Sequence, residues 1–355
     1  MKVAQTLSAR ALCNPSALPD WTLHEWETLI RQARRAGLLA RLAWLAQQSG
    51  GWERIPPQPR AHLEAAQTIA QSQAMAVQRE LFFLRQALDP LGVPIILLKG
   101  AAYLAAQLPP AHGRLFSDID LLVPESAIGE VETALMLRGW ASGHHDPHDQ
   151  RYYRKWMHEI PPLRHIRRMS VVDVHHAILP LTARIKTPSG PLIKAAIPLP
   201  DDPLFCILSP PDMVLHSATH LFHEGEFGRG LRDLSDLDAL LRHFGQHAAF
   251  WDALVGRARL LNLTRPLYYA LHYCRQVFDT PIPALPEDAR PTFPRLMDAL
   301  FERALAPEHA SCNDSFTPFA RGLLYIRSHW LRMPPWLLFR HLFHKAFISP
   351  KDKAK

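Results

Sequence analysis

Two aspartates stand inside a short apolar run, and this placement constrains the fold more than any other feature of the sequence. The run reads Asp118-Ile119-Asp120-Leu121-Leu122-Val123. Residues two apart on a β-strand point to the same side, so Asp118 and Asp120 would project together, with about 6–7 Å between their backbones. An unpaired charge in a buried strand is costly. The sequence therefore predicts a strand with one apolar face and one face suited to a cation.

A third acid lies on another predicted strand. Residues 170–176 alternate, with Asp173 flanked by valines and with His175 on the same face as Asp173. Carboxylates so placed suit Mg²⁺ or Mn²⁺, which take hard oxygen ligands. The alternative is a chance motif, since Asp-x-Asp often only caps a turn. The strand context favours the metal, and we predict three residues as both metal ligands and catalytic residues: Asp118, Asp120 and Asp173.

A glycine turn follows a further apolar run at residues 93–98, which is typical of a buried strand. Gly100 would let the backbone approach a ligand, and the helix predicted at 101–107 would offer free N–H groups to phosphate. Lys99 could add a positive charge, or it could simply be solvated. The turn is thus a candidate phosphate-binding element.

The chain divides into three predicted regions: helical residues 1–89, a mixed middle at 90–203, and helical residues 204–355. The fold class is therefore α+β, a small mixed sheet between N-terminal helices and a C-terminal helical domain. Residues 180–211 indicate loops and an edge strand, and the His- and Arg-rich residues 141–170 have no clear assignment. Helices are predicted at 21–48 (starting at Asp20 and broken near Gly37), 59–88, 126–138, 212–223, 230–244, 248–258, 265–276, 293–305 and 316–345.

Composition excludes several classes of protein. The chain of 355 residues has a net charge of +7, but no dense Lys/Arg patch with interleaved aromatics predicts nucleic-acid binding. Its four cysteines form no CxxC pair, which argues against a disulfide scaffold or a zinc knuckle. Residues 1–15 lack the apolar core of a secretory signal, and no run approaches the roughly 20 residues of a membrane span. We expect a cytoplasmic setting.

Several side features allow two interpretations. His144, His145 and His148 cluster, but an Asp-Pro step there favours a loop over a metal site. The basic residues of 151–168 could line a cleft or be solvated. The basic, aromatic residues 330–345 could touch a membrane surface, although packing is more common. On the C-terminal helices we expect Asp212 as an N-cap, an Arg232–Asp236 pair, and His216 and His220 in structural contacts.

The motifs resemble a known family. Leu98-Lys99-Gly100-Ala101-Ala102, then Arg114 to Val123 with its Asp-Ile-Asp-Leu-Leu core, are similar to the signature of an uncharacterised bacterial nucleotidyltransferase family within the polymerase-β-like superfamily. Val172-Asp173-Val174-His175 resembles that family's third-acid strand. The helical segment from Leu215 to Leu237 resembles its "H…LR…D" region. The similarity spans roughly residues 90–245.

The resemblance implies transfer of a nucleoside monophosphate from an NTP, with Mg²⁺ or Mn²⁺, to a hydroxyl acceptor and with release of pyrophosphate. It implies that the three aspartates hold the metal and that five residues meet the nucleotide: Lys99, Gly100, Ala101, Arg114 and Ser117. The superfamily usually has Gly-Ser or Gly-Gly at the turn, so Lys99 or Arg114 would replace the missing hydroxyl.

Three functions remain open from the sequence. The first is the transferase, with a small metabolite, a peptide or protein hydroxyl, or an RNA end as acceptor. The second is a module on the same scaffold that binds a nucleotide or a partner without turnover. The third is an interaction protein that acts through its helical ends and binds no nucleotide.

Overall fold

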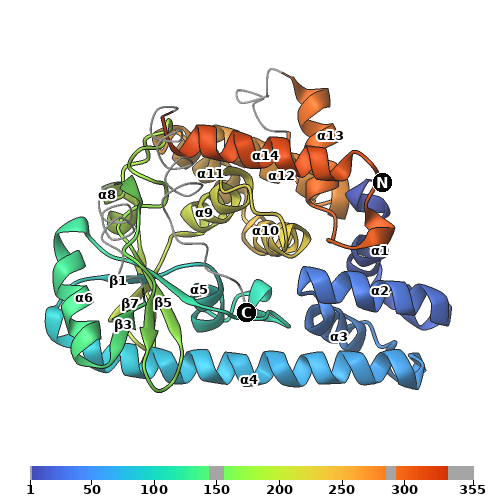
Figure 1. Ribbon diagram of the computed structural model, residues 1–355, viewed down its shortest axis with the longest axis horizontal. Coiled ribbons are helices and arrows are strands. Elements are labelled where there is room, and N and C mark those ends of the chain that lie inside the picture. Colours follow the sequence, from blue (N-terminus) through green and yellow to red (C-terminus); the bar gives the residue numbers. More distant parts are fainter. Residues whose placement is uncertain (1, 144–155, 285–292, 335–355) are drawn as a thin grey trace, which may run out of the picture.

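A seven-stranded mixed sheet lies at the centre of the described chain (Figure 1). The computed structural model describes residues 2–143, 156–284 and 293–334. The strand order is β3-β4-β5-β2-β1-β7-β6. The strands are β1 Ile95–Leu97, β2 Ile119–Leu122, β3 Trp140–Ser142, β4 Leu163–His165, β5 Val171–His175, β6 Ile197–Pro198 and β7 Phe205–Ile207.

Parallel and antiparallel pairs are both present in this sheet. Strand β2 runs parallel to β5, and β1 runs parallel to β7, whereas the other neighbours are antiparallel. Every residue of β1 and β2 is buried, because these central strands are covered on both faces. The α+β class with a mixed sheet, expected from the sequence, is confirmed.

The two faces of the sheet belong to different hydrophobic clusters. Ile119 and Leu121 of β2 pack on one face with Val77 and Leu84 of α4 (Pro57–Leu88) and with α6 (Ile128–Leu137). Leu122 points to the other face and joins the cluster built from α9 (Pro210–His223) and α10 (Gly230–Phe244). Figure 1 shows α4 below the sheet and α9 and α10 above it. The alternation of β2 thus separates two cores.

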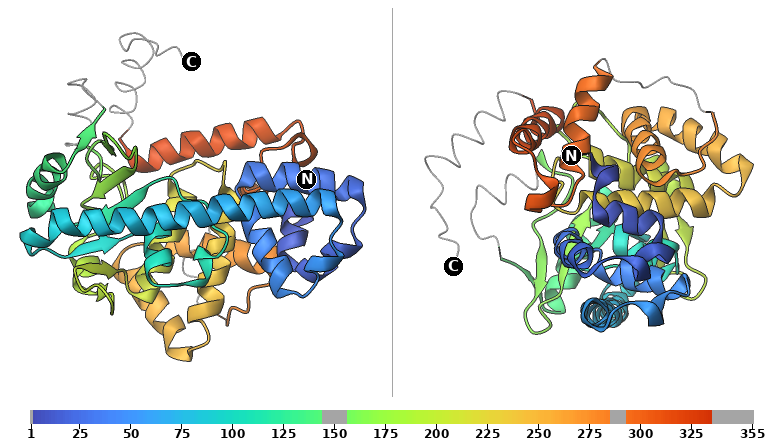
Figure 2. Two further views of the ribbon diagram at one scale, coloured as in Figure 1. Left: turned by 90° about the horizontal axis from the view of Figure 1, so that it is seen from below. Right: turned by 90° about the vertical axis from the view of Figure 1, so that its right-hand side faces the viewer.

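The N-terminal region forms four helices: α1 Leu7–Cys13, α2 Leu23–Ala36, α3 Leu39–Gln48 and α4. Thr22, not the predicted Asp20, caps α2, and it forms a capping box with Glu25. The break predicted near Gly37 is confirmed, since Gly37 adopts φ 69° after the last turn of α2. Helix α4 continues from beneath these helices to beneath the sheet (Figure 2).

The C-terminal region is also helical. Its described helices are α9, α10, α11 Ala248–Leu260, α12 Thr264–Phe278, α13 Pro294–Ala304 and α14 Thr317–Arg332, and the short helix α8 Gly190–Lys194 precedes this region. Helix α9 is the most deeply buried of these, and Ser209 precedes it at the N-cap. Asp212 is therefore a third-position residue and not the cap predicted from the sequence. Its carboxylate accepts a hydrogen bond from Ser209 and pairs with Arg257 of α11 at 2.6 Å.

Several short elements escaped the sequence analysis. Strands β3 and β4 lie in the unassigned residues 141–170 and at their edge, and β6 and β7 replace the one edge strand expected at 180–211. By contrast, helix α5 (Lys99–Ala105) after β1 was predicted, but it begins and ends two residues earlier than the expected 101–107. Short 3₁₀ turns occur at Val3–Gln5, Pro15–Asp20, Trp52–Arg54, Asp89–Leu91, Pro109–Ala111, Glu125–Ala127 and Ala310–Cys312.

Helix α14 ends at Arg332, whereas the predicted helix reached residue 345; its residues 335–345 lie outside the described ranges. Trp330 near its end is 49% exposed and packs under the guanidinium of Arg184. None of the helices in the described ranges is long and apolar enough to cross a membrane.

Candidate active site on the sheet

Two of the three aspartates stand directly opposite each other. Asp120 on β2 and Asp173 on β5 are register partners in a parallel pair, so their side chains leave the same face of the sheet. Asp118 immediately precedes β2 and is exposed, whereas the sequence placed it within the strand. Its carboxylate accepts a hydrogen bond of 2.9 Å from the Ser117 hydroxyl. The acids therefore form a pair, with Asp120 buried and Asp173 half-buried, and a third, solvent-accessible carboxylate lies near Asp120 in the sequence.

Asp120 is buried but well partnered. Its Oδ1 lies 3.4 Å from the Lys99 ammonium and 3.1 Å from His175 Nε2. Burial alone would raise the pKa of Asp120, but Lys99 and His175 lower it well below the usual range of a carboxyl. Asp120 in turn raises the pKa of Lys99 against the opposing effect of burial. The pair is therefore charged on both sides at neutral pH.

Asp173 lacks such compensation. Its Oδ1 is buried and has no hydrogen-bond partner among the described residues. Burial, followed by the nearby charges of Asp120 and Glu159, raises the pKa of Asp173 to about 7. An orphaned carboxylate oxygen beside a second carboxylate is an arrangement that a hard divalent cation would stabilise. The residues present thus fit a metal such as Mg²⁺.

The glycine turn packs closely against the loop that leads into β2. A Cβ on Gly100 would lie 3.0 Å from Arg114 Nε and 3.2 Å from the Phe116 ring, so only glycine fits there without a shift. Lys99, which precedes it, adopts the left-handed φ of 45°. Ala101 is buried, so only its backbone could meet a ligand. Close contact therefore fixes the turn at the edge of the carboxylate face.

Arg114 is held by a buried ionic group. Its guanidinium contacts Asp236 of α10, which also pairs with Arg41 of α3 at 2.7 Å. The predicted Arg232–Asp236 pair is wrong, because Arg232 bonds its neighbour Asp233 at 2.6 Å. The two arginines from distant segments reach Asp236 instead. Arg114 thus ties the loop before β2 to α3 and α10.

The structure adds Glu159 and Glu224, which the sequence analysis missed, and shows the surroundings of His216 and His220, which it named as structural. Glu159 pairs across the sheet with His175, and its carboxylate lies 3.3 Å from His175 Nδ1. Glu224 follows α9 and bonds His220 at 2.7 Å. His216 on α9 is buried, and burial together with Lys99 lowers its pKa to about 3. No local sequence pattern marks Glu159 as a site residue. It joins the site only because the fold places residues 158–160 beside β5.

Only part of the basic segment 151–168 lies within the described residues. Arg168 forms two hydrogen bonds of 2.8 and 2.9 Å with Glu80 of α4, and it lies over the Phe83 and Trp140 rings. It is therefore neither a free cation nor simply solvated. Residues 151–155 of the segment, with their arginines, and the predicted histidine cluster at 144–148 lie outside the described residues.

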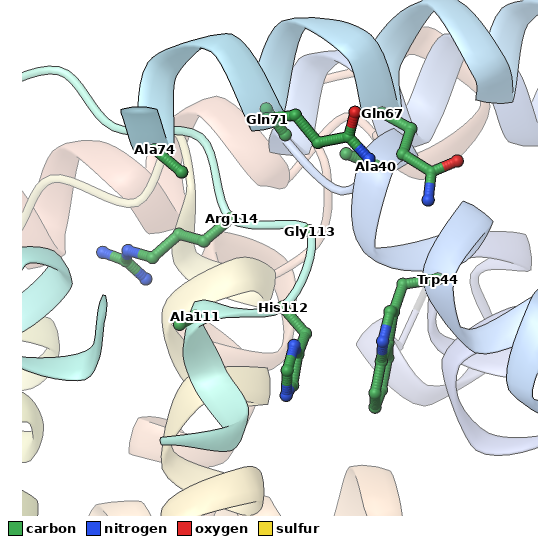
Figure 3. A pocket seen from close by; sticks show the side chains of 10 residues that line it. Ala40, Trp44, Gln67, Gln71, Ala74, Ala111, His112, Gly113 and Arg114 are labelled. Carbon is green, nitrogen blue, oxygen red and sulfur yellow. The ribbon is translucent and has the colours of Figure 1, made fainter. Parts of the chain in front are cut away.

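Two pockets open near the site. One of about 430 Å³ is lined by Ser117, Asp118, Phe116 and Arg168, between β2 and α4. The other, of about 200 Å³, lies between α3, α4 and the loop at 111–114 (Figure 3). There the Trp44 indole stacks on the His112 ring at 4.5 Å, while Arg114 points away from this pair. The first pocket has the larger volume of the two, and Asp118, a candidate metal ligand, lines it.

Comparison with known proteins identifies the family of the chain. The sequence profile of a family described as an uncharacterised nucleotidyltransferase matches residues 22–279, well over half of the chain. The match covers all three aspartates, the glycine turn and α9 to α12. No curated protein and no solved structure matches the chain. The chain therefore belongs to this uncharacterised nucleotidyltransferase family.

Proposed function

We propose that the protein transfers a nucleoside monophosphate from an NTP to a hydroxyl acceptor with release of pyrophosphate. The observation that carries this is the orphaned Oδ1 of Asp173 directly opposite Asp120. Asp118, Asp120 and Asp173 would hold Mg²⁺ or Mn²⁺. When bound, the metal would neutralise these carboxylates and the phosphates of the NTP and polarise the bond that breaks. Family membership supports the NTP as donor.

Asp173 is the best placed proton acceptor. Without metal, burial and the neighbouring carboxylates raise the pKa of Asp173 to about 7, and a bound cation would lower it. We assign Asp173 as the base because its Oδ1 has no other partner among the described residues. As the acceptor O–H bond breaks, its proton passes to Asp173 and its oxygen forms a bond to the α-phosphorus. The bond from the α-phosphorus to the bridging oxygen breaks, and pyrophosphate leaves with the electron pair. Positioning and charge stabilisation, rather than a covalent enzyme intermediate, would supply the rate.

The remaining residues bind and position. We assign Lys99, the backbone of Gly100 and Ala101, and the Ser117 hydroxyl to the triphosphate side of the site. Lys99 also keeps Asp120 ionised through their 3.4 Å contact. Arg114 is committed to Asp236, so we assign it to fixing the turn rather than to direct phosphate contact. The acceptor belongs to one of three classes: a small molecule, a peptide or protein hydroxyl, or an RNA end.

Labelled nucleotide tests the proposal. The purified protein is incubated with each α-labelled NTP and Mg²⁺ or Mn²⁺, with and without cell extract, beside the variants Asp120→Asn and Asp173→Asn. The matched control is Asp252→Asn, which removes an exposed carboxylate from α11. We expect label transfer or pyrophosphate release in the wild type and the control, and a loss of about 10²-fold or more in the two site variants.

Two outcomes would overturn the transferase. Turnover that survives in Asp120→Asn and Asp173→Asn would show that the chemistry happens elsewhere. Metal-dependent NTP binding without turnover in any extract would instead establish a nucleotide-binding module on the same scaffold.

A further inference from the structure

A second cluster of potential ligands lies beside the carboxylates. One donor atom from each of His158, Glu159 and His175 lies within 4.8 Å of the other two. The backbone explains this, because residues 158–160 run antiparallel to the end of β5, with His176 N–H donating to His158 O at 2.8 Å and Ile160 N–H donating to Val174 O at 3.0 Å. The segment that precedes β4 in the sequence and the strand that follows β4 thus bring these three side chains together.

The His175 ring places one nitrogen against each of two carboxylates. The ionised Asp120 carboxylate can only accept, so His175 Nε2 donates its proton across their 3.1 Å contact. His175 Nδ1 faces the Glu159 carboxylate at 3.3 Å. A proton on Nδ1 or a metal ion between Nδ1 and the carboxylate would each satisfy this second contact. Ligands that share one tetrahedral ion at bonds of about 2.0–2.1 Å are about 3.3 Å apart.

His158 supplies the independent observation. Its ring is 8% exposed, and its Nδ1 is buried without a hydrogen-bond partner within the described part of the chain. The His158 and His175 rings lie 5.3 Å apart. A buried nitrogen lone pair with nothing to bind is rare unless a ligand meets it. A proton shared by His175 and Glu159 would leave His158 unexplained, whereas a metal ion would satisfy all three side chains.

We propose that His158, Glu159 and His175 form a site for a divalent transition metal of the Zn²⁺ type, distinct from the Mg²⁺ site of the three aspartates. Imidazole ligands select such metals over Mg²⁺, which prefers oxygen. Asp120 is the outer partner that orients His175, since a metal-bound histidine commonly donates its other N–H to a carboxylate. Three protein ligands leave a fourth position open to water or to a ligand. The site does not depend on nucleotidyl transfer.

Cobalt provides a visible probe. The full-length protein, stripped with a chelator, is titrated with Co²⁺ and with Zn²⁺, and the d–d absorption of Co²⁺ and the bound metal per chain are measured. The variants are His158→Gln and Glu159→Gln, and the matched control is His247→Gln, an exposed histidine before α11. Asp118→Asn is included to separate this site from the proposed Mg²⁺ site. Circular dichroism of the metal-free variants confirms that they fold.

We expect one Co²⁺ per wild-type chain, with an absorption spectrum typical of nitrogen and oxygen ligands. His158→Gln and Glu159→Gln should weaken this binding by more than about a hundredfold, because even loss of an outer partner costs about ten- to a hundredfold. His247→Gln and Asp118→Asn should bind Co²⁺ as the wild type does. Zn²⁺ should raise the Tm of the wild type but not of His158→Gln.

Absence of Co²⁺ and Zn²⁺ binding, or binding unchanged in folded His158→Gln, would overturn the site. Binding lost equally in His247→Gln would show adventitious uptake by the twenty histidines. If Co²⁺ binds as expected while no NTP is turned over, the proposed function fails and the metal site stands. If NTP is turned over but Co²⁺ does not bind, the reverse holds.

Discussion

The carboxylate charge of Asp173 is compensated less well by the described residues than that of Asp120. Its neighbour Asp120 has Lys99 and His175 as partners, whereas Asp173 has an orphaned oxygen and a raised pKa of about 7. The folded protein therefore holds a proton on Asp173 that the unfolded chain releases near its ordinary pKa of 3.8. Because the folded pKa is the higher one, this contribution to stability is present below about pH 4 and is lost as the pH rises to about 7.

Asp173→Asn should accordingly stabilise the metal-free protein. We expect its Tm to exceed that of the wild type, with a larger gain near pH 8 than near pH 5.5, because more of the repulsion has developed at the higher pH. Each kcal/mol gained should raise Tm by about 2–4 °C or somewhat less for a chain of this size. Thermal melts in a chelator at the two pH values test this. An equal gain at both would show that Asp173 keeps an ordinary pKa.

At this scale the sequence was informative about some residues and silent about others. Asp120 and Asp173 stand out because charge inside an apolar strand needs a reason. Their direct pairing follows from the parallel register of β2 and β5, which no local pattern encodes. Glu159 and His158 lie in a stretch without clear periodicity, and only the fold brings them to His175.

Ionic contacts between elements fix the loop that enters β2. Asp236 of α10 receives Arg41 from α3 and Arg114 from the loop, and all three side chains are buried. Arg41 also donates to Ser235 and to the carbonyl of Pro110, each at 2.6 Å. Gln73 of α4 accepts a hydrogen bond of 2.9 Å from Phe116 N–H in the same loop. Three helices thus hold the approach to Asp118.

The substitution Asp236→Asn tests how much this ionic group contributes to the free energy of unfolding. Removal of the carboxylate leaves two buried guanidinium groups without their counter-charge, which typically costs about 3–5 kcal/mol. We expect a fall of that size in the free energy of unfolding measured with denaturant, and none beyond about 0.5 kcal/mol in the exposed control Asp252→Asn. A loss as small as that of the control would mean that water screens the group.

Element prediction succeeded where the signal was long. The helices with an amphipathic face, such as α10 and the capped helix α2, were placed within a few residues. Strands β3, β4 and β7 have three residues each and β6 has two, which is too short for an alternating pattern of apolar and polar residues to be recognised. Three of their pairs join strands that are consecutive in sequence, and only the pair of β7 with β1 joins distant segments. The shortness of these strands is therefore the main reason why the sheet could be only partly outlined in advance.

At the scale of the molecule, one hydrophobic cluster joins segments from both ends of the chain. It contains Trp26 of α2, Leu42 of α3 and Phe222 of α9, and it includes Ile96 and Leu122 from the sheet. The Cys13 thiol of α1 even contacts the carbonyl of Val277 in α12 at 3.1 Å. The N-terminal and C-terminal helices thus share a core above the carboxylate face.

The central region by itself should therefore not fold. A fragment of residues 90–203 would expose Ile96 and Leu122, which the helices cover in the full chain. We expect it to show no cooperative thermal transition by circular dichroism, whereas residues 2–334 should unfold cooperatively. A sharp transition in the short fragment would show that the sheet and its α6 cover suffice.

Helix α4 sets a mechanical limit on the site. It has 32 residues, about 48 Å at 1.5 Å per residue, and after Pro59 it contains neither glycine nor proline. Sharp bends in helices occur almost only at such residues or where a group inserts into the backbone hydrogen bonds. We therefore expect α4 to behave as one rigid helix. Because it underlies both the N-terminal helices and the sheet, we expect these parts to keep a fixed arrangement (Figure 2). Any opening toward the carboxylate face would then come from α9 and α10, which pack on that face of the sheet.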